Sequence, residues 1–253
     1  MVRIVGIVCL LLLNQLNGAT ESGITGGSVA KPHSRPYMAS LQIQRQHVCG
    51  GMLIRKDYVL TAAHCKDCYQ DMTVVLGAHN ISKGEKSQQK IGVRKYHVHP
   101  QYSSSGGLVY DIMLLKLERK AHLSQYVKTI ELPAEDEEIL ANVYCKVAGW
   151  GKTGPQKPPS DVLREAEEKI QFSFECKNIW KESFTSQQMI CTKFDRRRGG
   201  ICQGDSGGPL ICNNKVQGIA AFTFKDDCEN KTYPHVFTKV HYFLPWIKKV
   251  MQD

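Results

Sequence analysis

The chain has 253 residues, 42% of them hydrophobic, so it is long enough to bury a core in one or two domains. Its formal net charge is +9, and removing the first 23 residues, with their one Arg and one Glu, leaves that charge unchanged. A charge of this sign attracts polyanions such as sulfated glycosaminoglycans or anionic membranes. Nucleic acid is not expected as a partner, because no RNA- or DNA-binding motif stands out in the sequence.

The first residues have the pattern of a secretory signal peptide. Arg3 provides a basic start, Ile4 to Leu13 form an apolar run, and small residues follow around Gly18 and Ala19. We therefore predict a signal peptide over residues 1–19. The run is too short to span a membrane, which takes about 20 residues, and no other stretch is long enough. The sequence thus predicts an exported chain without a transmembrane segment, in a compartment where disulfides form.

Short strand-like runs, rich in Val, Ile, Leu and aromatic residues, follow one another along the rest of the chain. They lie at 37–44, 58–62, 72–76, 111–117, 146–149, 208–212 and 216–222. Only the last residues, from Tyr242 to Met251, place apolar side chains at helical spacing, with Pro245 suited to the first turn. The sequence predicts an all-β protein with a C-terminal helix, and the pattern alone fits either barrels or a sandwich.

One serine lies in a setting that suits a nucleophile. Gly204 and Gly207 flank Asp205 and Ser206, and glycine adopts the backbone angles that a tight, exposed turn requires. Such a turn can direct the N–H groups of Gly204 and Ser206 at one point, where they form an oxyanion hole for a tetrahedral intermediate. The motif makes Ser206 the candidate nucleophile, although an ordinary loop can also have this composition.

A serine hydroxyl needs a base, and the base needs an acid that fixes its tautomer. His64 follows a strand-like run and precedes Cys65, which Cys49 is near enough in sequence to tether. Asp111 begins an apolar strand-like run, where a carboxylate is costly unless it is paired. His64 and Asp111 are therefore the candidate base and acid for Ser206.

Three segments together resemble the chymotrypsin-fold serine proteases: Thr61 to Cys65, Asp111 to Leu115 and Gly204 to Leu210. Their order, His then Asp then Ser, is the order of that family, and the resemblance runs from Ile24 to the C-terminus. It implies a serine protease domain over 24–253, with two six-stranded antiparallel β-barrels over about 24–130 and 131–253 and the active site between them. It also implies a serine endopeptidase that needs no metal or organic cofactor.

The resemblance further implies activation by proteolysis. Ile24 would become the new N-terminus after removal of a propeptide over residues 20–23, and its ammonium would pair with Asp205 and order the oxyanion hole. A buried carboxylate without that partner is unfavourable, so the precursor should be misassembled around Asp205. Gly23 stands where trypsin-like activators find Arg or Lys, so a trypsin-like activator is not expected to make this cut.

Two further segments are similar to the granzyme, chymase and cathepsin G group: Pro32 to Ala39 and Leu76 to Ile81. Members of that group are stored in immune-cell granules, so we expect granule storage or secretion. The resemblance implies peptide or protein substrates, inhibitors of the serpin type, and packing on sulfated proteoglycan or heparin, which the basic charge fits. A basic run, Asp195 to Arg198, is either a solvated loop or an exosite for acidic groups.

The family pattern assigns eight of the nine cysteines that follow the signal region to four disulfides: Cys49–Cys65, Cys145–Cys212, Cys176–Cys191 and Cys202–Cys228. Cys68 is left over, and it can remain a free thiol, bridge to another chain or compete for Cys49. Two sequons, at Asn80 and Asn230, are candidate glycosylation sites in an exported chain.

The resemblance places the S1 specificity pocket at Gly200, Ile201, Thr223 and His235. Gly200 stands at the floor, where no carboxylate meets a basic P1 side chain, so Arg and Lys are disfavoured. Thr223 and His235 add bulk where the family usually or often has glycine, which favours a shallow pocket for small or medium apolar residues. A protonated His235 would instead attract an acidic P1 residue, and a deep pocket for aromatic residues is the third interpretation.

The sequence thus predicts a secreted or granule-stored serine endopeptidase that works through an acyl-enzyme and prefers a non-basic P1 residue. The rival function is that of a basic, weakly active or inactive homologue that binds polyanions or microbial surfaces. The presence of all three triad residues and both oxyanion-hole positions favours the enzyme.

Overall fold

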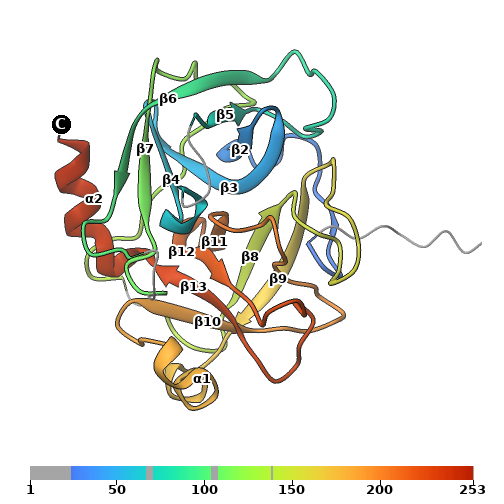
Figure 1. The fold of residues 1–253 in the computed structure, drawn as a ribbon, viewed down its shortest axis with the longest axis vertical. Coiled ribbons are helices and arrows are strands. Elements are labelled where there is room, and N and C mark those ends of the chain that lie inside the picture. The colour runs from blue at the N-terminus through green and yellow to red at the C-terminus, as the bar shows by residue number, and fades with distance from the viewer. Residues whose placement is uncertain (1–23, 67–70, 104–107, 138, 253) are drawn as a thin grey trace, which may run out of the picture.

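The computed structural model describes residues 24–66, 71–103, 108–137 and 139–252, and strands make up most of its regular structure. The strands are β1 (Ser28–Val29), β2 (Met38–Ile43), β3 (Gln46–Arg55), β4 (Tyr58–Thr61), β5 (Thr73–Leu76), β6 (Gln89–Val98), β7 (Met113–Leu117), β8 (Tyr144–Gly149), β9 (Arg164–Ile170), β10 (Met189–Lys193), β11 (Pro209–Cys212), β12 (Lys215–Phe222) and β13 (His235–Lys239). Two α-helices, α1 (Ser173–Trp180) and α2 (Leu244–Met251), complete the fold (Figure 1). The predicted signal peptide, propeptide and Cys68 lie outside the described residues.

The first barrel is closed by six antiparallel strands in the order β2-β3-β4-β7-β6-β5. Its interior is filled by the apolar side chains of these strands, and all four residues of β4 are buried. Closure leaves no free sheet edge, which an open sheet of this size would expose. The short apolar runs of the sequence therefore form a barrel and not one half of a sandwich.

The second barrel runs β8-β9-β10-β13-β12-β11 and closes through the pairing of β11 with β8. The short strand β1 adds to the outside of β9, so the N-terminal segment belongs to the surface of this second barrel. Residues of β9 alternate between the interior and the surface, and this alternation places Arg164 and Glu168 inside. The predicted pair of six-stranded antiparallel barrels is confirmed.

The two barrels meet where β3 of the first approaches the segment before β11 of the second (Figure 1). The Gly50 N–H donates to the Ser206 carbonyl over 2.8 Å, and the Gly50 carbonyl accepts from the Thr61 hydroxyl over 2.8 Å. A Cβ on Gly50 would lie 3.1 Å from the Gly208 backbone. Glycine at these positions lets the two backbones touch and fixes the height of Ser206 above the first barrel.

The C-terminal helix α2 packs back onto the first barrel, as Figure 1 shows. Its apolar face buries Leu244 and Ile247, and Pro245 lies in its first turn, as predicted. The Tyr58 hydroxyl donates to the Val250 carbonyl over 3.2 Å. Within the described residues, no helix is long and apolar enough to cross a membrane.

Candidate active site

His64 and Asp111 are brought together by neighbouring strands of the first barrel. Thr61 at the end of β4 pairs with Met113 at the start of β7, and a 3₁₀ helix over Ala63–Lys66 then turns His64 toward Asp111. The Asp111 Oδ2 lies 2.7 Å from His64 Nδ1, and its Oδ1 accepts the His64 backbone N–H at 2.9 Å. The Asp111 side chain is 3% exposed and that of His64 is 31% exposed. The ring is thus held with its proton on Nδ1, so the lone pair that a base needs is on Nε2.

Ser206 lies in a turn that only glycine permits. Gly204 and Gly207 have φ values of 95° and 77°, a left-handed region that side chains strongly disfavour. A Cβ on Gly207 would also lie 2.1 Å from the Thr61 hydroxyl oxygen. The turn can therefore pass close to β4, the strand that leads into His64, and Ser206 remains partly exposed to a surface cavity.

An oxyanion hole requires N–H groups that are not already bonded to backbone carbonyls, and the N–H groups of Gly204 and Ser206 meet this requirement. Within the described part of the chain, neither of them donates to a backbone carbonyl. The N–H of Asp205 between them is used, because it donates to the Cys202 carbonyl over 3.0 Å. The turn thus leaves one N–H donor on each side of Asp205 for a ligand oxygen.

His47 supports this turn, a role that was not predicted from the sequence. Its Nε2 donates to the Gly204 carbonyl over 2.9 Å, and its Nδ1 accepts from the Ser40 hydroxyl over 2.9 Å. Burial of the ring lowers the pKa of His47 to about 4, so the ring is neutral and has one donor and one acceptor nitrogen. The His47–Gly204 contact joins residues 157 apart in the sequence. No sequence motif around His47 predicts this contact.

Asp205, within the turn, and Ile24, in the core of the second barrel, are both buried. Asp205 is 1% exposed and accepts the N–H groups of Gly151 and Cys202 at 2.8 and 2.9 Å. Its burial in this site raises the pKa of Asp205 from 3.8 to about 7, in spite of these two bonds. Ile24 has no exposed surface, and the next residue, Thr25, donates its hydroxyl to the Glu229 carboxylate at 2.5 Å.

A cavity of about 210 Å³ opens beside Ser206. Its lining includes Ile201 and Thr223, two of the residues predicted for the S1 pocket, and Ala221 and Phe222 from β12. Gly200 and His235, the other two, are not among its lining residues. His235 is 1% exposed, and both of its ring nitrogens bond to interior groups. The interpretation of His235 as a charge that faces an acidic P1 residue therefore does not match its position.

Four disulfides are present, between Cys49 and Cys65, Cys145 and Cys212, Cys176 and Cys191, and Cys202 and Cys228. Two of them fix the site: Cys49–Cys65 adjoins His64, and Cys202–Cys228 adjoins the cavity. Among the described residues, one cluster has the spacing of metal ligands, Cys49 with His64 and Cys65. Its two sulfur atoms are joined to each other, so this cluster offers no thiolate to a metal.

The two sequons differ in how their asparagines are bonded. The Asn80 side-chain oxygen Oδ1 accepts the N–H and hydroxyl of Ser82 at 2.9 and 2.8 Å. The Asn230 amide nitrogen, the atom that a glycan would modify, donates to Asp227 over 3.0 Å. Glycosylation at either asparagine stays a prediction.

The fold and the site define a class: a double β-barrel protein with a carboxylate–imidazole pair opposite a glycine-bounded serine turn. The trypsin family matches residues 24–247 of the chain. Rat granzyme B is 45% identical over 251 residues and covers 97% of this chain and 98% of its own. Guinea-pig chymase is 40% identical over 247 residues, with 96% of each chain covered.

A solved structure agrees with this assignment. Neuropsin, a serine protease expressed in the limbic system of mouse brain, superposes with a TM-score of 0.81 at 35% identity, over 89% of this chain and 98% of its own. The chain therefore belongs to the trypsin family. It is a serine endopeptidase similar to the granzymes and mast cell proteases.

Proposed function

We propose that Ser206, His64 and Asp111 form the catalytic triad of this endopeptidase. The observation that carries the proposal is that Asp111 makes two hydrogen bonds to His64, one of 2.7 Å to ring Nδ1 and one of 2.9 Å to the backbone N–H. These two bonds leave the second ring nitrogen as the base that takes the Ser206 proton. The N–H groups of Gly204 and Ser206 then stabilise the oxyanion of each tetrahedral intermediate.

The reaction proceeds through an acyl-enzyme. Ser206 Oγ attacks the scissile carbonyl while His64 accepts its proton, and His64 then donates that proton to the leaving amine. Water then attacks the ester carbon while His64 accepts one of its protons, and His64 donates that proton to Ser206 Oγ as the acyl group leaves. Asp111 stays ionised throughout and stabilises the imidazolium that forms twice in each turnover.

Activation would proceed by release of the Ile24 amine, whose ammonium would pair with Asp205. The support for this step is that both residues are buried, that Thr25 pairs with Gly200 ahead of the Asp205 turn, and that Asp205 has no cationic side chain bonded to it among the described residues. We further propose that the enzyme is stored in granules or secreted, and that serpin-type inhibitors act on it.

The proposed P1 preference is for small or medium apolar side chains. The cavity beside Ser206 is lined by Ile201, Ala220, Ala221 and Phe222, and its lining carboxylate, Asp226, is exposed to solvent beside Lys225 instead of buried at the bottom. Thr223 adds a branched side chain to the same lining. Burial of an Arg or Lys head group without a countercharge is costly.

A peptide-library scan tests the triad and the P1 preference together. The protein for this experiment is the 24–253 chain with Ile24 as its first residue, and Ser206→Ala is the control. We expect cleavage after residues such as Val, Leu or Met, and a loss of about 10⁶-fold in kcat in the control. Cleavage that persists in Ser206→Ala, or that occurs mainly after Arg or Lys, would contradict the proposal.

Gly200→Asp is expected not to create cleavage after Arg or Lys. A Cβ at this position would lie 2.6 Å from His235 Cε1 and 2.8 Å from Glu168 Oε1, so the new side chain has no room in the interior behind the cavity. We expect a loss of roughly 1–3 kcal/mol in the free energy of unfolding from overpacking. Thermal unfolding measures the loss of stability, and the same peptide library measures the P1 preference. A stable variant that cleaves after Arg would contradict the expected crowding around residue 200.

A basic groove on the second barrel is the proposed site for sulfated proteoglycan. We name it the Tyr144 groove; it is lined by Tyr144, Lys169, Lys193, Arg196, Arg197, Arg198 and Lys231 together with Glu167 and Asp195. Arg198 lies 4.2 Å above the Tyr144 ring, which keeps its guanidinium at the surface. Sulfate groups suit such planar, always charged donors.

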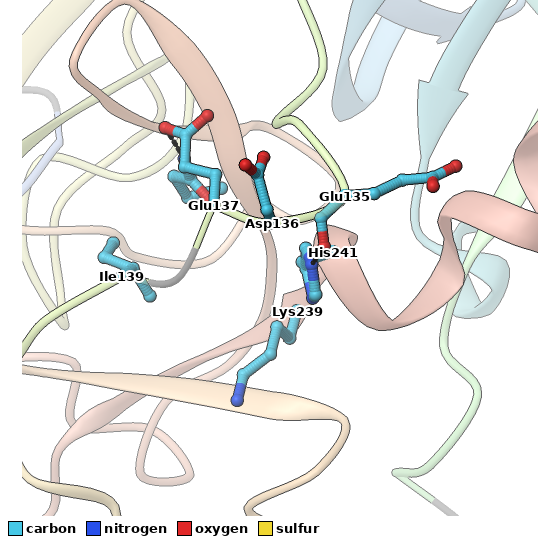
Figure 2. Close-up of a pocket in the computed structure, with 7 residues that line it drawn as sticks. Glu135, Asp136, Glu137, Ile139, Lys239 and His241 are labelled. Carbon is cyan, nitrogen blue, oxygen red and sulfur yellow. Dashed lines mark hydrogen bonds between the residues drawn. The ribbon is translucent and has the colours of Figure 1, made fainter.

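Another hollow of this barrel has the opposite charge. Figure 2 shows Glu135, Asp136 and Glu137 on one segment beside His241 and Lys239. Glu137 is bonded to Lys215 at 2.6 Å, but Asp136 adds negative charge that repels a polyanion. The net charge of the chain is therefore distributed unevenly, and the Tyr144 groove is the better place for a sulfated ligand.

Replacement of Arg196 and Arg197 by alanine is expected to move elution from immobilised heparin to a clearly lower salt concentration. The slope of log affinity against log salt should fall by about one for each lost contact. The matched control is the double replacement Arg94→Ala and Lys95→Ala, which removes two exposed cations from β6 of the first barrel. Equal shifts for the two double variants would rule out a defined groove and leave only a general charge effect.

A further inference from the structure

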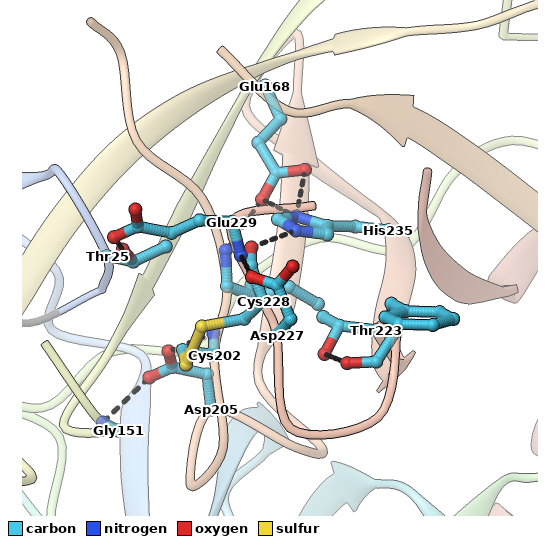
Figure 3. The surroundings of a disulfide bond; sticks show 12 residues. Thr25, Gly151, Glu168, Cys202, Asp205, Thr223, Asp227, Cys228, Glu229 and His235 are labelled. Carbon is cyan, nitrogen blue, oxygen red and sulfur yellow. Dashed lines mark hydrogen bonds and ion pairs between the residues drawn. A yellow bond between two sulfur atoms is a disulfide. The ribbon is translucent and has the colours of Figure 1, made fainter. Parts of the chain in front are cut away.

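A carboxylate and an imidazole lie buried against each other behind the S1 cavity. Glu168 comes from β9 and His235 from β13, and their side chains are 0% and 1% exposed. His235 Nδ1 lies 3.1 and 3.0 Å from the two Glu168 carboxylate oxygens. Figure 3 shows the pair next to the Cys202–Cys228 disulfide.

The hydrogen bonds of His235 fix its protonation. Its Nε2 lies 2.9 Å from the Cys228 carbonyl, while its Nδ1 faces the Glu168 carboxylate. A carbonyl and a carboxylate only accept, so both ring nitrogens must donate and the ring is an imidazolium. Burial opposes this charge, but Glu168, the Cys228 carbonyl and the more distant Asp205 together raise the pKa of His235. The Phe194 ring also packs on the His235 ring, but it is uncharged and does not shift the charge balance of the pair.

The ion pair is bonded to the segments that line the cavity. Glu168 Oε1 accepts the N–H of Ile201 at 2.8 Å, and its Oε2 accepts the hydroxyl of Thr192. His235 donates to Cys228, whose disulfide partner Cys202 lines the cavity together with Ile201. The two charges thus lie only one residue layer behind the surface that a P1 side chain touches.

We propose that Glu168 is a specificity-determining residue, because it holds the His235 charge inside the barrel and keeps the S1 cavity without a net charge. The proposal rests on the proposed function and names what limits its P1 preference. With Glu168 ionised, the two opposite charges largely cancel at the cavity, so a P1 carboxylate gains nothing for its lost hydration. Without Glu168, burial opposes the charge on the His235 ring, and a P1 carboxylate becomes the group that can hold it, so the ring takes up a proton with such a substrate and does so more readily at low pH.

The variant Glu168→Gln separates the two charges with almost no change in volume. The measurement is the ratio of kcat/KM for two peptides that differ only in P1, Glu against Leu, at pH 5.5 and 8. A ratio removes the titration of His64, which affects both peptides equally. We expect Glu168→Gln to raise the Glu/Leu ratio by about tenfold or more at pH 5.5 and by less at pH 8. An unchanged ratio at pH 5.5 would overturn the proposal.

Two controls distinguish this role from a purely structural one. Glu167→Gln removes the neighbouring carboxylate of β9, which is exposed and paired with Arg198, and should leave the ratio unchanged. In a His235→Gln background, Glu168→Gln should have no further effect on the ratio, because Glu168 acts through the imidazolium. A change of the same size in that background would contradict the proposal, whereas a loss of stability alone lowers both rates together.

A binding experiment decides the inference without catalysis. Product peptides that end in Leu or in Glu place that residue in S1, and the Ser206→Ala protein binds them without cleavage. The Glu/Leu ratio of their affinities should rise about tenfold on addition of Glu168→Gln at pH 5.5. Nitrogen-15 spectra of the same protein should show both His235 nitrogens protonated at pH 7.5, and a neutral ring would refute the ion pair. If the native chain cleaves nothing, the proposed function fails while these two measurements still decide the role of Glu168.

Discussion

Replacement of Asp111 by asparagine is expected to lower kcat by about 10⁴-fold and to leave KM nearly unchanged. The Asp111 carboxylate accepts two bonds from His64, one from Nδ1 at 2.7 Å and one from the backbone N–H at 2.9 Å. An asparagine can turn its NH₂ group toward Nδ1, which places the ring proton on the nitrogen that faces the substrate. The base for Ser206 is then lost in the dominant tautomer, although the shape of the site is unchanged.

The matched control is Asp57→Asn, another acidic side chain of the first barrel that is mostly shielded from solvent. Asp57 bonds to Arg55 at 2.6 Å and to Lys116 at 2.8 Å, in the turn between β3 and β4. Its replacement should lower the unfolding temperature and leave kcat of the folded protein almost unchanged. Steady-state rates and circular dichroism of the two variants separate the effects. An Asp111→Asn protein with native kcat would eliminate the triad assignment.

The parts of the molecule that could be predicted are those whose chemistry lies within a few consecutive residues. The turn around Ser206 is an example, because its glycines are adjacent in the sequence and its backbone angles demand them. The apolar run after Asp111 forms β7, and the helical spacing near the C-terminus forms α2. Each of these segments contains its own signal, so no distant partner is needed to interpret it.

The charged strand β9 shows why other parts could not be predicted. Its sequence, Arg164 to Ile170, has three glutamates and gives no apolar strand pattern, yet every second residue faces the interior. Glu168 is tolerated there because His235, 67 positions further along the chain, lies against it. The same pair explains why His235 was predicted in the S1 pocket but does not line the cavity. The family resemblance predicts where the His235 backbone lies, but not that the ring turns toward the buried Glu168.

The N-terminal segment is a second case of this kind. A boundary at about residue 130 assigns residues 24–130 to the first barrel, but β1 pairs with β9 of the second. Ile24 also packs in the core of the second barrel with Phe237 and Leu210. This placement follows from pairings across more than 130 residues, and it brings the predicted new N-terminus to the barrel that contains Asp205.

Retention of residues 20–23 is expected to lower activity by about 10²–10³-fold or more, the effect of losing one oxyanion-hole donor. While Ile24 is preceded by Gly23, its nitrogen belongs to a peptide bond and carries no charge. Asp205 is then a buried carboxylate with two N–H partners only, and burial raises its pKa from 3.8 to about 7. The segment from Cys202 to Ser206 is anchored by that carboxylate, so its protonation or displacement disturbs the oxyanion donors.

The sign of the pH dependence distinguishes the two forms of the chain. Because the folded pKa of Asp205 is raised, the unprocessed chain loses stability as pH rises from about 4 to about 7, by roughly 4 kcal/mol in total. After cleavage, the Ile24 ammonium supplies the missing partner and this loss should largely disappear. The paired amine has a raised pKa, so its contribution is present below about pH 8 and is lost at higher pH, together with activity.

Chemical unfolding of the Ser206→Ala forms that begin at residues 20 and 24 provides the measurement. The processed form should be more stable, and its advantage should grow between pH 5 and pH 8. Asp205→Asn should abolish the advantage, because an amide neither needs nor attracts the ammonium, whereas the exposed Asp161→Asn should preserve it. A stability difference that is independent of pH would mean that the two forms differ for a reason other than the charge on Asp205, and the Ile24–Asp205 pair would have to be abandoned as the activation contact.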